Sequence, residues 1–281
     1  MRTFAKQTKL AFILAMCAVG ATETLAQGSG VANATVTPDP NQVKGAAIIQ
    51  QMLKRNSERT AALERYTSER TYSLDYSGTG GEHHAEVKVH AEYTRPERKH
   101  LTIVAESGSK FLCEKVLRKL VEGEQEASEG NNRNQISLGP ENYTAVLIGE
   151  ETPDWPGVTP GVKAWVLRVT PKIDNKFTYA GRIWISEDDF AIMRILAEPA
   201  KNPSFWLNHA SMDMRYIRHG DLWLPGKNIS SSHIKIGGEA KMTIDYGTYP
   251  VVAASPVRST VETAEVQAQS AKVMNASLSE R

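Results

Sequence analysis

The sequence has little cysteine and little net charge, and each shortage excludes a class of protein. Only Cys17 and Cys113 occur among 281 residues, which excludes a disulfide-rich scaffold and a zinc cluster built from cysteines. The formal net charge is +1, so the chain has no broad electrostatic field for nucleic acid or an anionic membrane surface. An apolar stretch over residues 10–19 is shorter than the roughly 20 residues that a membrane span needs.

Catalytic motifs are also missing. The sequence has no Gly-x-Ser-x-Gly elbow, no His-Glu-x-x-His motif and no phosphate-binding loop, and we therefore predict a protein without enzymatic activity or a cofactor. His83 and His84 are consecutive in an expected strand and point to opposite faces. His84 and His90 share a face but lie about 20 Å apart at roughly 3.3 Å per residue, too far for one metal ion. The acidic residues 187–189 favour a turn over a carboxylate site.

The N-terminal residues are typical of an export signal. Three basic residues precede the apolar stretch 10–19, and Thr24 and Ala26 place small residues at −3 and −1 of a cleavage site after Ala26. A retained membrane anchor is the alternative. A second alternative is lipid attachment at Cys17, although Met16 stands where a lipobox has a small residue. We predict cleavage after Ala26 and a periplasmic or secreted protein.

The composition predicts one domain between two irregular ends. After the signal peptide (1–26), residues 27–41 are rich in Gly, Ala, Thr, Val and Pro and are interpreted as a flexible linker. Residues 251–281 have no aromatic side chain and are predicted to be a disordered tail. The domain is then expected over 42–250. Cleavage removes three basic residues and one acidic residue, so the formal charge falls from +1 to −1.

The hydrophobic pattern predicts an α+β fold that is mainly β. A helix is expected to about residue 63, and residues 84–93 alternate between apolar and polar side chains, as in a strand with one buried face. Residues 109–127 have helical spacing and end on Glu122, Glu124 and Glu126. Strand patterns then continue to about residue 249, joined by short turns that favour antiparallel neighbours. We predict a meandering sheet of about ten strands that curls under its own twist, with helices against its concave face.

The positive functional signal is apolar. Large side chains recur at alternating positions of the predicted strands, which suits the wall of a cavity for greasy ligands. The candidate cavity residues are Tyr72, Leu74, Trp165, Trp184, Ile192, Met212, Met214 and Tyr216. The alternative is that these residues pack a closed core against the helices, because close packing is the usual state of a protein interior.

Two local motifs resemble a known family. Tyr93-Thr94-Arg95-Pro96 resembles an aromatic-x-Arg-Pro motif that ends an early strand, and the residues GRIWIS (181–186) followed by AIMRI (191–195) resemble a characteristic strand pair. The order of elements and these motifs are similar to the LolA/LolB/RseB superfamily of periplasmic lipoprotein-handling proteins. The resemblance covers about residues 43–249. It implies an unclosed β-barrel whose concave face, covered by helices, holds acyl chains.

The resemblance also implies functional roles. Arg95 would be the latch that holds the helical lid shut, and the alternative is a turn residue beside Pro96. The ligand would be a lipid or lipoprotein acyl chain, carried or sorted toward the outer membrane with an inner- or outer-membrane partner protein. The helix at 109–127 and the segment 199–206 depart from the pattern of the lipoprotein carrier LolA. An RseB-like envelope sensor or protein-interaction module without lipid transfer is therefore the alternative function.

Overall fold

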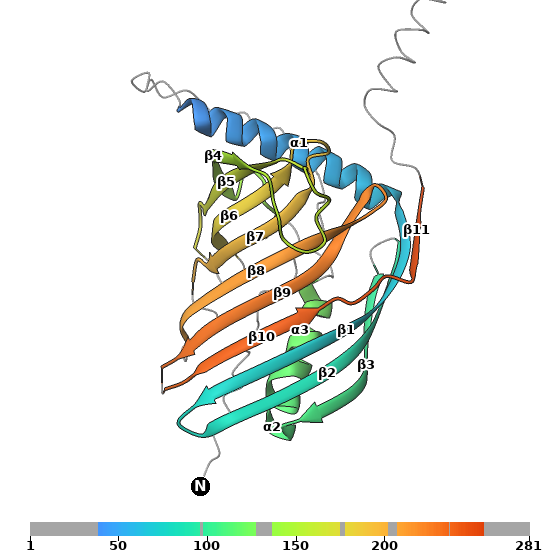
Figure 1. Cartoon of the computed structure of the whole chain (residues 1–281), viewed down its shortest axis with the longest axis vertical. Helices are drawn as coiled ribbons and strands as arrows, with labels where there is room; N and C mark the ends of the chain where they lie inside the picture. The colour runs from blue at the N-terminus through green and yellow to red at the C-terminus, as the bar shows by residue number, and fades with distance from the viewer. Residues whose placement is uncertain are drawn as a thin grey trace, which may run out of the picture.

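The computed structural model describes residues 39–95, 98–127, 137–174, 178–201, 207–235 and 237–255. The predicted signal peptide, Cys17, the linker up to residue 38 and the tail beyond residue 255 lie outside these ranges. Helix α1 (Pro40–Ala62) leads into three strands, β1 (Leu63–Gly78), β2 (Gly81–Thr94) and β3 (Arg98–Gly108). Figure 1 shows α1 crossing one end of a large curved sheet.

A helical segment and eight further strands follow. The segment comprises α2 (Lys110–Leu112), the π-helical turn η1 (Cys113–Leu117) and α3 (Arg118–Ala127). The strands after it are β4 (Tyr143–Glu151), β5 (Ala164–Pro171), β6 (Tyr179–Ser186), β7 (Ile192–Pro199), β8 (Leu207–His219), β9 (Leu222–Ile234), β10 (Glu239–Asp245) and β11 (Val251–Ala254).

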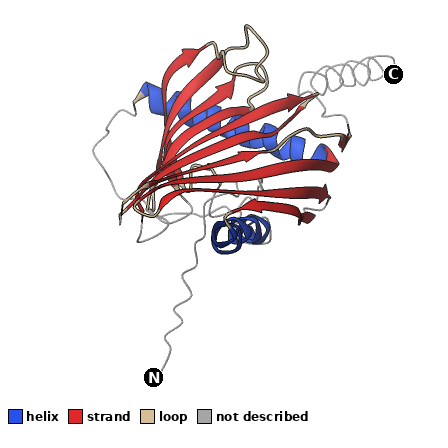
Figure 2. Cartoon of the chain, turned by 60° about the horizontal axis from the view of Figure 1, so that its bottom comes forward, coloured by secondary structure: helices blue, strands red, loops and turns tan. Residues whose placement is uncertain are grey.

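All eleven strands belong to one antiparallel sheet that does not close. The strand order is β3-β2-β1-β10-β9-β8-β7-β6-β5-β4, with β11 beside the start of β1. The predicted mainly-β half-barrel is confirmed, but its topology is not the simple meander that we expected. The chain leaves β3 through the helical segment and returns at the opposite edge as β4, so β1 pairs with β10. Figure 2 shows the strands fanning out along the curved sheet.

Local sequence explains where the helices begin. Asp39 caps α1, because its side chain accepts a hydrogen bond from the amide of Asn41 (3.0 Å), and Pro40 occupies the first turn, where no amide hydrogen is needed. Ser109 caps α2 in the same manner through the amide of Leu112 (3.5 Å). Both predicted helices are confirmed, and so is the turn at residues 187–189.

The domain is slightly wider than predicted. Helix α1 already begins at Pro40, inside the segment interpreted as a linker, and β11 (Val251–Ala254) lies in the segment interpreted as a tail. The register pairs β11 with residues Leu63–Thr67 of β1. None of the helices in the described ranges combines the length and the apolar composition that crossing a bilayer requires.

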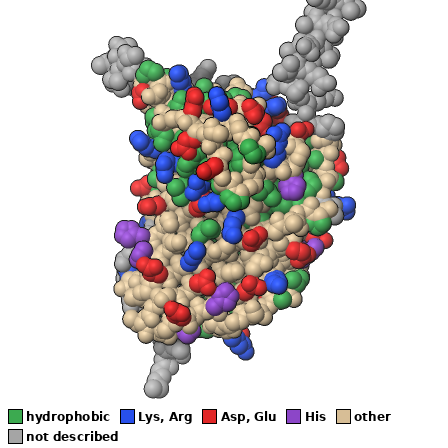
Figure 3. Space-filling model, viewed as in Figure 1, with side chains coloured by type: hydrophobic (Ala, Val, Ile, Leu, Met, Phe, Trp, Pro, Cys, Tyr) green, Lys and Arg blue, Asp and Glu red, His purple; other side chains and the backbone are tan. Residues whose placement is uncertain are grey.

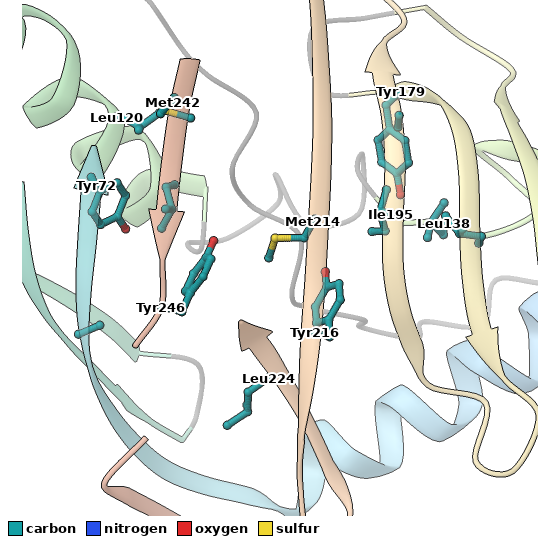
Figure 4. Close-up of a cluster of buried hydrophobic side chains, with 14 of the residues drawn as sticks. Tyr72, Leu120, Leu138, Tyr179, Ile195, Met214, Tyr216, Leu224, Met242 and Tyr246 are labelled. Atoms are coloured by element: carbon teal, nitrogen blue, oxygen red, sulfur yellow. The ribbon is translucent and has the colours of Figure 1, made fainter. Parts of the chain in front are cut away.

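The two faces of the sheet differ in character. One face packs against both helices in a single apolar cluster, which we call the inner cluster. Its helical members include Ile49, Met52, Leu117, Leu120 and Val121, and its strand members include Tyr72, Val87, Leu167, Ile183, Ile195, Met214, Tyr216, Met242 and Ile244. Figure 4 shows such side chains, among them Tyr72, Met214 and Tyr246, pointing into a common interior. The face that carries the inner cluster is called the inner face below.

The opposite, outer face is largely polar. On β1 and β2, His84 Nδ1 lies 2.7 Å from Asp75 Oδ1, and His90 lies between Glu69 and Glu92. These exposed pairs fit the prediction of solvated strand histidines. The carboxylates of Glu69 and Glu92 accept hydrogen bonds from the protonated imidazole and raise the pKa of His90. Figure 3 shows acidic, basic and histidine side chains interspersed over the visible face of the molecule.

Candidate functional site

Seven of the eight predicted cavity residues come together on the inner face. Four of them are buried within the inner cluster: Tyr72, Leu74, Met214 and Tyr216. Trp165, Ile192 and Met212 also pack against this cluster but are only partly buried. Because these residues come from β1, β5, β7 and β8, apolar side chains recur on the inner face across most of the sheet.

Trp184 lies on the other face. It belongs to a small outer cluster with Ala164, Val166 and Met193, against which Trp155 packs. The Trp184 indole donates to Glu151 Oε2 (2.7 Å), and the Arg194 guanidinium lies 5.1 Å from its ring centre. The strand β6 is apolar on both faces at this point, so alternation could not assign Trp184 to a side.

The partly buried residues form a row on the inner face. The register places Trp165, Ile185 and Ile192 side by side on β5, β6 and β7. The ring of Phe190 lies 5.1 Å from the ring of Trp165, also in contact with the inner cluster. Ile185 is fully buried at the centre of this row, whereas the flanking side chains retain accessible surface. An apolar side chain that stays accessible on an inner face is a candidate ligand contact.

Arg59 fixes the C-terminal half of α1 over the adjacent turns. Its Nε donates to the carbonyl of Asp221 (3.1 Å), and its Nη2 donates to the carbonyl of Asp189. The same nitrogen lies 3.4 Å from the Asp189 carboxylate, which also accepts a hydrogen bond from the Trp223 indole (2.8 Å). Arg59 is 8% exposed. Its buried guanidinium therefore attaches the helix to two turns between strands, one at Asp189 and one at Asp221.

The N-terminal half of α1 is positioned by close packing on β4. A Cβ atom placed on Gly45 would lie 2.6 Å from the carbonyl oxygen of Ala145 and 3.1 Å from the amide nitrogen of Leu147. Because both of these atoms belong to the backbone, neither can move aside without displacing the strand. Glycine at position 45 therefore sets how closely α1 approaches the sheet.

A buried polar network attaches α3 to β1. Arg70 Nη1 donates to Glu124 Oε1 (2.7 Å), and the Tyr72 hydroxyl donates to Glu124 Oε2 (2.6 Å). Lys99 of β3 donates to the same carboxylate. Arg70 further donates to Ser68 Oγ (3.1 Å). The side chains of Arg70 and Glu124 are 0% and 1% exposed, so each charge depends on the other for stabilisation.

The electrostatics of this network keep Glu124 ionised. Burial by itself raises the pKa of Glu124, but the charges of Lys99 and Arg70 outweigh it and lower that pKa to about 2. Burial also raises the pKa of Tyr72 well above its usual value, which keeps its hydroxyl protonated as a donor. The carboxylate of Glu124 therefore accepts hydrogen bonds from three side chains on two strands, β1 and β3, over the whole physiological pH range.

Arg95 bridges the end of β2 and the end of α1. Its guanidinium Nη1 donates to the carbonyl of Ala61 (2.7 Å), and its backbone amide donates to the carbonyl of Glu64 (2.9 Å). Ala61 lies in the last turn of the helix, where carbonyl groups have no partner within the helix. Arg95 is exposed and lies in a turn, so both features expected of it, a helix contact and a turn position, occur together.

The sequence contained signals for residues that we did not select. Arg70 has the same strand parity as Tyr72 and Leu74, which places a cation on the apolar face. Glu124 lies seven and four residues after Leu117 and Leu120, on the buried stripe of its helix. A charged residue in register with an apolar stripe is therefore the sign of a buried ion pair.

Metal and thiol chemistry find little support in the described residues. Within those ranges, no group of three or more His, Cys, Asp or Glu side chains is arranged to hold a metal ion. Cys113 is free and 3% exposed. Burial raises the pKa of its thiol, which disfavours the reactive thiolate.

Comparison with known proteins gives structural likenesses only. No protein-family model and no curated protein matches the chain. A DUF1329 family protein from Desulfovibrio piger is 15% identical with a TM-score of 0.39, and the match covers 79% of this chain and 96% of that one. A LolA superfamily protein from Nitrosomonas europaea is 11% identical with a TM-score of 0.34, covering 76% and 95%.

A third match is to a complex of two proteins. The Pseudomonas aeruginosa MucA/MucB structure contains a chain that is 12% identical with a TM-score of 0.26, covering 76% of this chain and all (100%) of that one. The matched structures thus include a LolA superfamily protein. At such low identities and TM-scores, the likenesses carry no argument about function.

Proposed function

We propose that the protein acts outside the cytoplasm and binds the acyl chain of a lipid or lipoprotein between its sheet and its helices. The observation that carries the proposal is the row of partly buried apolar side chains on the inner face, which includes Trp165, Phe190 and Ile192. Met212 adds a fourth partly buried side chain on the same face. Aromatic and methionine side chains adapt to flexible hydrocarbon, and each buried CH₂ contributes about 0.8 kcal/mol.

The attachment of the two helices gives this proposal a mechanism. Helix α3 is bound through a buried charge network, whereas α1 is attached through packing, Arg59 and Arg95. The helix α1 is then the movable lid of the site, and α3 is its fixed wall. Arg95 holds the end of the lid nearest β1, the latch role that the family resemblance implies.

The test is acyl-chain binding by matched variants. Purified protein is analysed by native mass spectrometry for co-purified lipid and titrated with a fluorescent fatty acid. Ile192→Glu places a carboxylate on the inner face and should weaken binding at least tenfold, because the charge must be desolvated beside the chain. Ile173→Glu makes the same change at a side chain that is 71% exposed and should bind as the unmodified protein does.

Two results would contradict the proposal of acyl-chain binding. Protein that is repeatedly free of lipid and binds no acyl probe, while both variants keep the native circular dichroism spectrum, rules out acyl binding. Equal affinities for Ile192→Glu and Ile173→Glu would move the site away from the inner face.

A protein-interaction module is the second candidate, and the sheet edges favour it. Among the described strands, β3 and β4 lie at the two edges and each has a neighbour on one side only. Each also carries an exposed apolar side chain, Val104 (56%) and Ile148 (39%). Such an edge can accept an extended segment of a partner protein as an additional strand. Pro substitution at Val104 should abolish partner binding without changing acyl binding if this candidate is correct.

A further inference from the structure

A line of polar side chains crosses the inner face on β9. Asn228, Ser230 and Ser232 occupy alternate positions of the strand and are 2%, 9% and 6% exposed. Because alternate residues of a strand share a face, the three side chains form one line, which we call the polar track. Buried polar groups are uncommon on an apolar face unless they have partners, so the polar track needs an explanation.

Apolar side chains lie in register on both sides of the polar track. Met214 of β8 and Ile244 of β10 flank Asn228, and Met212 and Met242 flank Ser230. The small residues Ala210 and Ala240 flank Ser232. The polar track is therefore flanked by three methionines, of which Met214 and Met242 are labelled in Figure 4.

Asn228 has an unused hydrogen-bond acceptor. Its Oδ1 is buried and has no hydrogen-bond partner among the described residues. A buried acceptor without a partner destabilises the folded state, and an apolar side chain of similar shape avoids that cost. Tyr179 of β6 presents a second buried hydroxyl without a partner in the described ranges, also within the inner cluster. The fold itself gains nothing from either polar atom.

We propose that Asn228 accepts a hydrogen bond from an N–H group of the bound ligand, so that the preferred ligand is an amide-linked acyl chain. This inference rests on the proposed acyl-binding function and specifies its ligand class. The Oδ1 atom needs a donor, which a hydrocarbon chain or an ester linkage does not provide. The flanking methionines hold the chain on either side of the amide, and the donor satisfies the acceptor that the fold leaves open.

A matched pair of ligands tests the donor directly. N-hexadecanoyl-glycine methyl ester and O-hexadecanoyl-glycolic acid methyl ester have the same chain and the same carbonyl groups, and differ in one N–H group that is replaced by oxygen. The unmodified protein should bind the amide about tenfold more tightly, which corresponds to ~1.4 kcal/mol for one buried hydrogen bond. Competition against a fluorescent fatty acid gives both dissociation constants.

Substitution of Asn228 tests whether its Oδ1 is the atom that accepts the hydrogen bond from the ligand N–H group. Asn228→Leu should bind the two ligands with equal affinity and should keep the native stability, because it removes a buried acceptor, Oδ1, that has no partner among the described residues. Asn228→Ala provides a second variant without the acceptor in case the larger side chain disturbs packing. Ser231→Ala changes the neighbouring residue on the exposed face of β9 and should preserve the tenfold ratio.

The outcomes separate this inference from the function on which it rests. If the unmodified protein binds neither ligand, the proposed function itself fails. If it binds both equally, acyl binding stands and the amide preference is overturned without recourse to any variant. If the preference persists in Asn228→Leu and Asn228→Ala, the ligand amide bonds elsewhere and the assignment to Asn228 is wrong.

Discussion

Helix α1 and helix α3 cover the same face of one sheet, yet different chemistry attaches them. In α3 the central contact is a carboxylate, Glu124, that is fully enclosed and paired with Arg70, Tyr72 and Lys99. In α1 the contacts are an apolar stripe, a glycine against β4 and a cation, Arg59, that mainly bonds backbone carbonyls.

Because the attachments differ, we expect the attachment of α3 to be sensitive to changes of charge and the attachment of α1 to be sensitive to changes of side-chain volume. A buried ion pair tolerates the loss of both partners better than the loss of one, because a single remaining charge is uncompensated. A glycine contact responds to volume and is indifferent to pH. The comparison therefore predicts that substitutions of charge act on α3, and substitutions of size act on α1.

The largest effect is expected from breaking the charge pair of α3. Glu124→Ala leaves Arg70 buried without its partner and should lower the free energy of unfolding by about 3–5 kcal/mol. Urea unfolding followed by tryptophan fluorescence at pH 7 measures the loss. The double variant Arg70→Met with Glu124→Leu replaces the pair by apolar side chains and should recover most of that stability. An unchanged midpoint for Glu124→Ala would show that α3 is attached by other contacts.

Acid should weaken α3 through the same carboxylate. The pKa of Glu124 is lowered from 4.5 to about 2 in the folded protein, so its contribution is complete above the unfolded pKa and is lost as the pH falls from about 5 to 2. The shift corresponds to about 3 kcal/mol of stability. Unfolding free energies measured at pH 7, 5, 4 and 3 should fall more steeply for the unmodified protein than for the Arg70→Met, Glu124→Leu double variant. Parallel curves would contradict this role.

The same substitution, glycine to alanine, tests how tightly each of the two helices is packed. Gly45→Ala in α1 drives a methyl group into the backbone of β4 and should cost about 1–3 kcal/mol. Gly123→Ala in α3 meets no atom within 4 Å and should stabilise the protein by up to about 1 kcal/mol, because alanine favours a helix over glycine. Thermal unfolding of both variants gives the two signs. A loss of stability in both would remove the distinction between the helices.

The same comparison shows what the sequence could predict. Residues 84–93 gave strand β2 correctly because one of its faces is buried and the other is exposed, which produces clean alternation. The helix over 109–127 was predicted from a helical spacing that included Phe111, Val116 and Leu120. Phe111 is 67% exposed, and the buried stripe consists of Cys113, Leu117, Leu120 and Val121. Local periodicity thus identifies elements whenever each has one buried face.

Long-range features left no local pattern. The pairing of β1 with β10 joins Thr71–Ser77 to residues more than 160 positions away, and no spacing within either strand encodes it. The sequence could not predict on which face of the sheet Trp184 lies, because Ile183, Trp184 and Ile185 are all buried and the alternation is lost. Arg70 and Glu124 were not selected as candidates, although each lies in phase with apolar neighbours. The polar track was hidden because Asn228 resembles an ordinary exposed strand residue.

The smallest effect is expected at Arg95, where the attachment of α1 meets the proposed function. Its bond to the carbonyl of Ala61 is exposed, so Arg95→Leu should change the free energy of unfolding by less than about 1 kcal/mol. If α1 is the lid, loss of this bond should release a bound acyl probe about fivefold faster, the ratio that corresponds to ~1 kcal/mol. Stopped-flow displacement of a fluorescent fatty acid measures the release rate.

Arg65 provides the matched control for this last variant. It is exposed on β1 opposite Thr94, the residue that precedes Arg95. Arg65→Leu removes an equal charge from the same region without touching the end of α1, and should leave the release rate unchanged. Equal rates for Arg95→Leu and the unmodified protein would make Arg95 a turn residue only. Faster release in both variants would instead indicate that net charge near this end of the sheet, and not the latch, controls the exit of the ligand.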